Sequence, residues 1–401
     1  MVGNQHDPKP KEAPMAFSPP ASLLEPDQRS IQDDYPPDLD SASISDSILD
    51  YEFENGRRYH AYKAGSYPLP NDEQELERID IKHHVTLLLA GGHLHLAPLN
   101  SPKRILDIGT GTGIWAIEMA EQYPHSQVIG TDLSPVQPSW VPDNVRFNID
   151  DCEAKIWTWP EDHFDYVHSR YMIASIGNWA SMIRKAYRHT KPGGYFELQE
   201  LDCRFTSDDN SLFESHNLTY WSHLITEAAA KYNRPIPRYT DYIHWFEKAG
   251  FTDVRQVIFK CPTNPWPKNK ILKEAGKFQL LAHTEGLEGV SMGLLTRGLA
   301  WKAEEVKVLM AKIRPELKDR GIHSYQTTVF ITGRKPGNPR HSNNYTSTSR
   351  RGNSAAPLTP NSISSSAAQS PHDHGSPPPQ EEINAFTPVI PVAGHGPSGC
   401  D

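Results

Sequence analysis

The sequence lacks the features that mark secreted, zinc-bound or membrane-spanning proteins. Its 401 residues include only four cysteines, none in a CxxC pair, so no zinc framework is indicated and disulfides are not expected. The longest largely apolar run, Val85 to Gly92, is far too short to span a bilayer. The N-terminus also lacks the charged and then apolar segments of a secretory signal. We therefore expect a soluble intracellular protein that is not an integral membrane protein.

Clustered positive charge is missing as well. The net charge is −9, from 40 lysines and arginines against 49 acidic residues, and no basic run stands out. Proteins that bind duplexes usually present a basic face, because contacts to phosphate dominate their affinity. We expect no direct binding to nucleic acid.

Apolar residues are scarce at both ends of the chain. Only 37% of the residues are hydrophobic, 35 are proline, and the mean hydropathy is −0.60. Residues 1–50 predict an acidic disordered tail, and residues 336–401 a Ser/Pro-rich one, because such stretches bury too little apolar surface to offset the entropy of ordering. Residues 51–335 predict the folded domain.

Strand and helix signals alternate in this domain, which predicts an α/β fold with a parallel sheet. The predicted strands are 104–107, 127–131, 145–149, 164–168, 195–199, 254–259 and 325–333. A helix over 71–96 is expected to precede them, and a mostly helical cap or insertion at about 205–250 to interrupt them.

Three alternating glycines directly follow the first of these strands. Gly109, Gly111 and Gly113 stand in the segment LDIGTGTG, with Thr110 between the first two, and a helix is predicted from residue 114. Glycine permits positive φ angles and close approach of the backbone to a ligand, and the start of a helix offers free amide groups. The loop therefore predicts a nucleotide or nucleoside site.

The spacing of the loop favours S-adenosylmethionine (SAM) over a nicotinamide cofactor. Dinucleotide loops favour GxGxxG, whereas here the third glycine comes one position earlier. Asp107 ends the strand, and a carboxylate there would repel a pyrophosphate but attract the ammonium group of SAM. The nicotinamide cofactor is the alternative.

Two further strands end in acidic residues. Asp132, followed by Leu133, ends the second strand, where a carboxylate can accept from both ribose hydroxyls. Asp151, followed by Cys152, comes after the third strand, where it can accept from the adenine amino group. The alternative is that these acids are helix caps or turn residues.

The order and spacing of five segments carry a family resemblance. LDIGTGTGIWAIEMA, VIGTDLSPVQP, VRFNIDDCEAKIW, FDYVHSRYM and KPGGYFELQE resemble the motif series of class I SAM-dependent methyltransferases. The residues of these segments are similar to those of the fungal LaeA-like methyltransferases, and so is the upstream segment from YEFENGRRYHAY to ERIDIKHH. The resemblance covers about residues 51–335.

This resemblance implies a Rossmann-like class I sheet of seven strands, mostly parallel with the last antiparallel, and helical N-terminal and cap elements. It implies SAM as cofactor and a regulatory role in fungal development or secondary metabolism. Location in nucleus and cytoplasm, and protein partners such as velvet-type regulators, are implied too. His168, Ser169 and Arg170 match the family's loop after strand four, near the methionine end of the cofactor. Tyr62 or Tyr67 is a candidate to close over the cofactor, or else packs in the core.

Candidate catalytic bases are few. Methyl transfer from a sulfonium needs alignment above all, and a base only where the acceptor must lose a proton. His168 and Glu200 lie near strand ends on the ligand side, although packing explains the histidine at least equally well. Of Glu197 and Glu200, one is a candidate buried structural partner. Aromatic residues of the cap are candidates either for an acceptor pocket or for the core of the cap, namely Tyr220, Trp221, Tyr239, Tyr242 and Trp245.

Three functions remain open at this point. The first is a methyltransferase that regulates development or secondary metabolism through protein targets, chromatin included. The second is a SAM-binding regulatory subunit with little catalysis. The third is a biosynthetic O- or N-methyltransferase for a small molecule.

Overall fold

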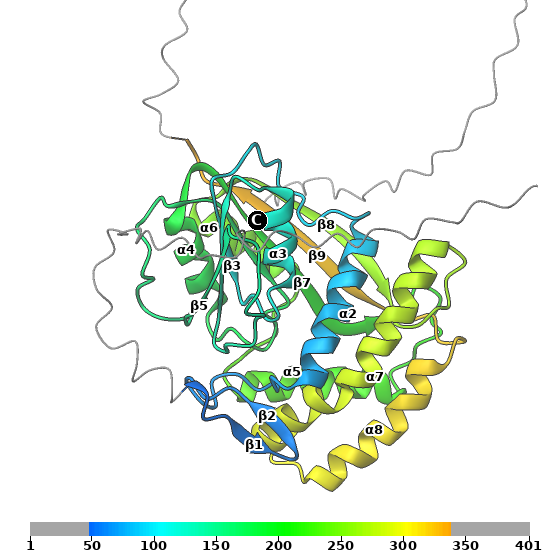
Figure 1. Ribbon diagram of the computed structural model, residues 1–401. Coiled ribbons are helices and arrows are strands. Elements are labelled where there is room, and N and C mark those ends of the chain that lie inside the picture. The colour runs from blue at the N-terminus through cyan, green and yellow to red at the C-terminus, as the bar shows by residue number, and fades with distance from the viewer. Residues whose placement is uncertain (1–47, 338–401) are drawn as a thin grey trace, which may run out of the picture. The chain divides into compact units, whose positions relative to one another are not determined.

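The computed structural model describes residues 48–337, which form a seven-stranded sheet with helices on both faces and a helical layer beside it (Figure 1). The strands of the sheet are β3 (Arg104–Ile108), β4 (Gln127–Asp132), β5 (Val145–Ile149), β6 (Phe164–Arg170), β7 (Thr190–Thr206), β8 (Thr252–Pro262) and β9 (Tyr325–Arg334). A separate hairpin consists of β1 (Glu52–Glu54) and β2 (Arg57–Tyr59). The predicted tails lie outside the described residues, apart from their inner ends.

The order of the strands is β5-β4-β3-β6-β7-β9-β8. The first five strands in this order run parallel to one another, and β9 runs antiparallel between β7 and β8. The chain order therefore reverses between β3 and β6, where β4 follows β3 on one side and β6 lies on the other. The predicted sheet is confirmed, with all seven strands and an antiparallel last one. The carboxyl ends of β3, β4 and β6 meet at one edge, where open α/β sheets bind ligands.

Successive side chains of the strands fill two different apolar cores, as the period of two requires. Ile105 packs in the core with α3 (Ile114–Gln122), and Leu106 packs in the core with α4 (Trp179–His189) and α6 (Asp241–Ala249). Both residues are fully buried. The continuous apolar composition of the strand follows from this burial on both faces.

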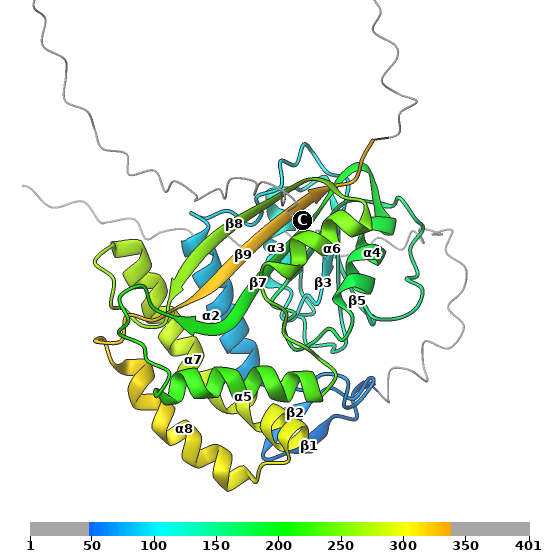
Figure 2. The same cartoon turned by 180° about the vertical axis from the view of Figure 1, so that it is seen from behind.

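The helical layer consists of α2 (Glu73–Leu89), α5 (Asn217–Lys231), α7 (Lys270–Leu299) and α8 (Ala303–Lys318) (Figure 2). Side chains of α5, α7 and α8 form a third apolar core that includes Trp221, Leu294 and Ile313, and Val85 of α2 packs with Ala275 of α7 in a fourth. Within residues 48–337, no helix has the length and apolar character needed to cross a bilayer.

Two boundaries differ from the sequence-based expectation. The helix predicted over 71–96 ends at Leu89, because Gly91 and Gly92 adopt positive φ angles of 65° and 85°. Of the cap expected at about 205–250, only α5 joins the helical layer. α6 covers the sheet instead, where Phe246 stacks on Phe196 of β7 with ring centroids 4.9 Å apart.

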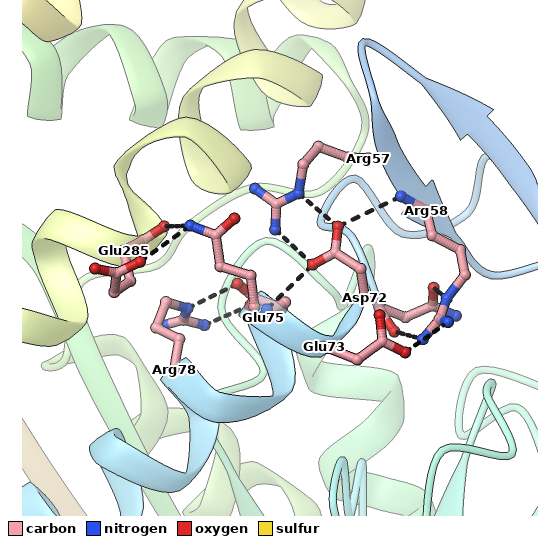
Figure 3. A network of polar contacts seen from close by, with 9 residues as sticks. Arg57, Arg58, Asp72, Glu73, Glu75, Arg78 and Glu285 are labelled. Carbon is pink, nitrogen blue, oxygen red and sulfur yellow. Dashed lines mark hydrogen bonds and ion pairs between the residues drawn. The ribbon is translucent and has the colours of Figure 1, made fainter.

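The start of α2 is fixed by side-chain capping (Figure 3). Asp72 accepts a hydrogen bond from the amide of Glu75 at 3.1 Å, which satisfies one of the free amides of the first turn. The same carboxylate accepts two hydrogen bonds from the guanidinium of Arg57, at 2.5 and 2.7 Å. The hairpin and α2 are thereby joined, and the helix is held across the edge of the sheet.

Candidate functional site

A pocket lies at the carboxyl edge of β3, β4 and β6, between the sheet and the helices α2, α5 and α7. The predicted cofactor residues that line it are Asp107, Gly109, Thr110, Gly111, Asp132, Leu133, Asp151, Cys152 and His168. Gly113 is not among the lining residues. Sequence reasoning thus selected residues from four separate segments that the fold brings to one place.

The glycine loop has the geometry that the sequence indicates. Gly109, Gly111 and Gly113 have φ angles of 68°, 56° and 82°, a region that favours glycine. A Cβ atom at Gly109 would lie 2.1 Å from the sulfur of Met172, and one at Gly113 would lie 2.4 Å from the ring of Phe147. Side chains are therefore excluded on both sides of the loop. α3 begins at Ile114, directly after Gly113, whose position gives the helix no side-chain cap.

Asp132 is held by backbone groups at the end of β4. Its carboxylate accepts from the amide of Gly111 at 2.9 Å and from the amide of Ser134 at 3.1 Å. Burial raises its pKa, and these amides act in the opposite direction. Each oxygen keeps further lone pairs, so the carboxylate can also accept from a diol that enters the pocket.

Asp107 and His168 form a buried pair on β3 and β6. Nδ1 of His168 lies 2.7 Å from one oxygen of Asp107, and the hydroxyl of Thr110 donates to the other at 2.6 Å. The imidazole stacks on Trp115, with ring centroids 3.6 Å apart and planes 8° apart. Asp107 therefore fixes both the loop and the imidazole. The second ring nitrogen of His168, Nε2, has no partner among the described residues.

The acids after β5 are tied into a turn. Asp151 forms an ion pair with Lys63 and accepts from the amide of Glu153 at 2.8 Å. Asp151 is therefore a turn residue, which was the alternative reading of the sequence, and it also lines the pocket. Burial raises the pKa of the Cys152 thiol, which stays protonated near neutral pH.

Glu200, the second candidate base, is fully buried in β7 and is not among the residues that line the pocket. Its carboxylate accepts from the amide of Met172 at 2.7 Å, and burial raises its pKa to about 8. Glu197 accepts from the amides of Leu96 and Ala97 at 2.9 and 2.7 Å, as a buried structural partner does. The catalytic role of Glu200 stays a prediction.

The pocket is also lined by residues that sequence reasoning did not select. Arg78 and Lys82 come from α2, His283 from α7 and Gln326 from β9. Of the five aromatic residues considered for the acceptor pocket, only Trp221 lines this one. The only sequence signal for the new set is the spacing of Arg78 and Lys82, which places both on one face of a helix.

Tyr67 and Arg170 also line the pocket, whereas Tyr62 does not. Arg170 donates to Nδ1 of His83 at 2.8 Å, and burial lowers its pKa. Ser169, between two pocket-lining residues of β6, is fully buried and faces away.

Comparisons with known proteins agree with this geometry. Residues 81–256 match the model of a family described as "Methyltransferase domain". The methyltransferase pytC of Aspergillus terreus is 41% identical over 79% of this chain and 98% of that protein. The secondary metabolism regulator LAE1 of Cochliobolus heterostrophus is 37% identical over 71% of this chain and 94% of that protein. The protein-methionine methyltransferase laeA of Emericella nidulans is 36% identical over 71% of this chain and 76% of that protein.

Among solved structures, the phosphoethanolamine N-methyltransferase 2 of Haemonchus contortus in complex with SAM aligns at 20% identity. The TM-score is 0.40, over 63% of this chain and 52% of that one. Class I methyltransferases take their methyl group from SAM, and the carboxylate of Asp132, which lines the pocket, can accept from the diol of its nucleoside. The chain belongs to the family of fungal class I methyltransferases that includes pytC and the LaeA regulators.

Proposed function

We propose that this chain methylates a compact acceptor in fungal secondary metabolism, with SAM as the methyl donor. The observation that carries the proposal is the continuity of the pocket. It runs from the glycine loop, where a nucleoside fits, to an apolar end lined by Trp221, Ile225 and Leu294. An acceptor that enters this end meets the methionine end of the cofactor inside the protein.

The cofactor is assigned residue by residue within this proposal. Asp132 takes the ribose hydroxyls and Asp151 the adenine amino group. Asp107 and His168 lie toward the methionine end, and Arg170, a partly buried cation beside them, suits the methionine carboxylate. In-line transfer then depends on alignment of acceptor, methyl and sulfur, which the walls of the pocket provide.

Regulation through protein targets is the second candidate, favoured by the names of the LAE1 and laeA relatives. It includes residence in nucleus and cytoplasm and binding to protein partners, velvet-type regulators among them. A SAM-binding subunit without turnover would satisfy this candidate as well.

The cofactor site is tested by calorimetry with SAM on the wild type and two variants. Asp132→Ala removes two charge-assisted hydrogen bonds to the ribose, and Gly111→Val places a β-branched residue at a positive φ. We expect each to weaken binding by about 100-fold or more while the fold is kept. Asp143→Ala, at an exposed acid, and Gly91→Val, at a positive-φ glycine outside the pocket, are the matched controls. Normal binding in both test variants contradicts the site.

The nature of the acceptor is tested with methyl-labelled SAM, full-length protein and an extract of fungal cells. Label in molecules small enough to pass a size filter supports the proposal, and its absence from Asp132→Ala shows that it depends on the site. Label confined to protein would favour the regulatory candidate. Tight binding of SAM without label in either fraction would favour the regulatory subunit.

A further inference from the structure

A buried lysine lines the pocket. Lys82 of α2 is only 5% exposed, and its ammonium group donates to the side-chain oxygen of Gln279 of α7 at 2.9 Å. It also lies over the ring of Tyr171, 4.7 Å from the centroid. Lys82 and Tyr171 both line the pocket. A lysine this deep normally has an anionic partner, because burial of an unpaired charge is costly.

No such partner is present among residues 48–337, where none of the ion pairs includes Lys82. The contrast with its neighbour Arg78 is direct. Arg78 donates twice to the carboxylate of Glu75, at 2.8 and 2.6 Å (Figure 3). Although burial opposes its charge, this carboxylate holds the pKa of Arg78 above its ordinary value. The charge of Arg78 is thus balanced within the protein, and that of Lys82 is not.

The remaining polar neighbours of Lys82 are neutral. Gln279 also donates to Gln326 of β9 at 3.3 Å, and its amide group contacts the ring of His283 at 2.8 Å. Burial, together with the positive charges of Lys82 and Arg78, lowers the pKa of His283 to about 3, so this imidazole carries no charge near neutral pH. Local dipoles solvate the ammonium group but do not neutralise it.

This lysine lies close to the proposed methionine end of the cofactor site. Tyr171, over whose ring it lies, directly follows Arg170 at the end of β6. Asp80, two residues before Lys82 on α2, accepts a hydrogen bond from Thr112 of the glycine loop at 2.7 Å. Apolar side chains about one turn away on the same two helices, Ile79 of α2 and Ala282 of α7, also line the pocket.

We propose that the acceptor is an organic acid with an apolar body, whose ionised oxygen is bound by Lys82. This inference rests on the proposed function and specifies its substrate class. An acid restores the charge balance that the buried ammonium lacks, and the apolar walls take the rest of the molecule. A neutral amine or thioether suits this end poorly, because methylation by a sulfonium would leave a new positive charge beside Lys82.

The proposal also accounts for the lack of a free base at the site. An acid that arrives ionised has no proton to lose before it accepts a methyl group. His168 is engaged with Asp107, and Glu200 lies outside the pocket lining, so neither is required.

A pair of matched probes tests the inference on the full chain saturated with S-adenosylhomocysteine. 2-Naphthoate is the acid, and 2-naphthalenemethanol is its neutral counterpart of similar shape. We expect calorimetry to show about tenfold tighter binding of the acid, the value of one charge-assisted hydrogen bond. Lys82→Gln should bring the two affinities to within about twofold, since the charge is gone.

A second variant neutralises the charge of Lys82 while the lysine is kept. Gln279→Glu places a carboxylate against Lys82, and it should also abolish the preference for the acid. Lys277→Gln, an exposed position on the same helix whose lysine pairs with Glu274, should keep it. Thermal unfolding of each variant shows whether the fold is retained. If Lys82→Gln does not fold, the affinities of Gln279→Glu for the two probes test the inference.

Equal affinities of the two probes for the wild type, or a preference that survives in both variants, would overturn the inference. So would a loss of S-adenosylhomocysteine affinity in Lys82→Gln, because the lysine would then hold the carboxylate of the cofactor. Failure of the wild type to bind S-adenosylhomocysteine at all is a different result, which overturns the proposed function and this inference with it.

Discussion

The two ends of the pocket are built in different ways. At the cofactor end, backbone groups fix the polar side chains: the amides of Gly111 and Ser134 hold Asp132, and both lie within a few positions of a strand end. At the acceptor end, side chains hold one another across helices, as Lys82 and Gln279 do from α2 and α7. The first arrangement is as rigid as the sheet. The second depends on how the helices pack.

This difference implies that the two ends are separable. A change in the helical layer can reshape the acceptor end while the strand ends and the glycine loop stay in place. The reverse does not hold, because the sheet supports both. A family with one cofactor and several acceptors would gain from such a division. Three substitutions test how complete the separation is.

Glu200→Gln should have the largest effect, and on stability. Glu200 has an ordinary pKa near 4.5, and burial raises it to about 8 in the folded protein. The folded state therefore binds more protons than the unfolded chain between these values. The contribution of this carboxyl to stability is fully present below about pH 4.5 and is lost as the pH rises through about 8. Glutamine has no such titration.

Relative to the wild type, Glu200→Gln should therefore gain stability between pH 5 and pH 9, on the order of 3 kcal/mol. Unfolding by urea at several pH values measures it, and Glu214→Gln, at an exposed position, is the control. If Glu200 has a structural role and is not a catalytic base, methyl transfer persists in the variant. Abolished transfer with normal SAM binding would restore Glu200 as the base.

Val290→Phe tests the separation from the acceptor side. Val290 of α7 lines the apolar end of the pocket, and a phenyl ring there takes space from the acceptor. Overfilling of this kind costs about 1–3 kcal/mol, so the affinity for 2-naphthoate should fall about tenfold. Calorimetry should find SAM binding unchanged, and Val308→Phe, exposed on α8, should alter neither. A matching loss of SAM affinity in Val290→Phe would show that the ends are coupled.

The cofactor end of the pocket could be predicted from the sequence, whereas the acceptor end could not. Gly111 and Asp132, which share a hydrogen bond, are only 21 positions apart, and each follows a strand with a clear apolar pattern. Local pattern and the rule for strand ends suffice to bring them together. The central strands β3, β4 and β6 could be placed for the same reason, because burial on both faces makes each a short, largely apolar run.

The acceptor end depends on contacts that no local pattern encodes. Lys82 and Gln279 are 197 positions apart, and the polar face of α2 is buried against α7 instead of solvent. α7 itself is rich in glycine, which disfavours helices. A Cβ atom at Gly286 would lie 2.3 Å from the side chain of Arg78, so close packing of the two helices overrides that propensity. Such a constraint becomes visible only once the two helices are side by side.

The smallest expected effect comes from the N-terminal segment, where the sequence left two tyrosines as candidates to close over the cofactor. Tyr67 lines the pocket and Tyr62 does not. Burial raises the pKa of Tyr67, with Glu75 and Asp132 acting in the same direction, so its hydroxyl stays protonated and can donate. One neutral hydrogen bond is worth about 1 kcal/mol, so Tyr67→Phe should weaken SAM binding about fivefold in calorimetry. Tyr62→Phe should leave it unchanged. Equal losses in both would mean that the segment acts as a whole, by ordering over the cofactor, and that the cofactor end is less firmly held by the sheet than its hydrogen bonds indicate.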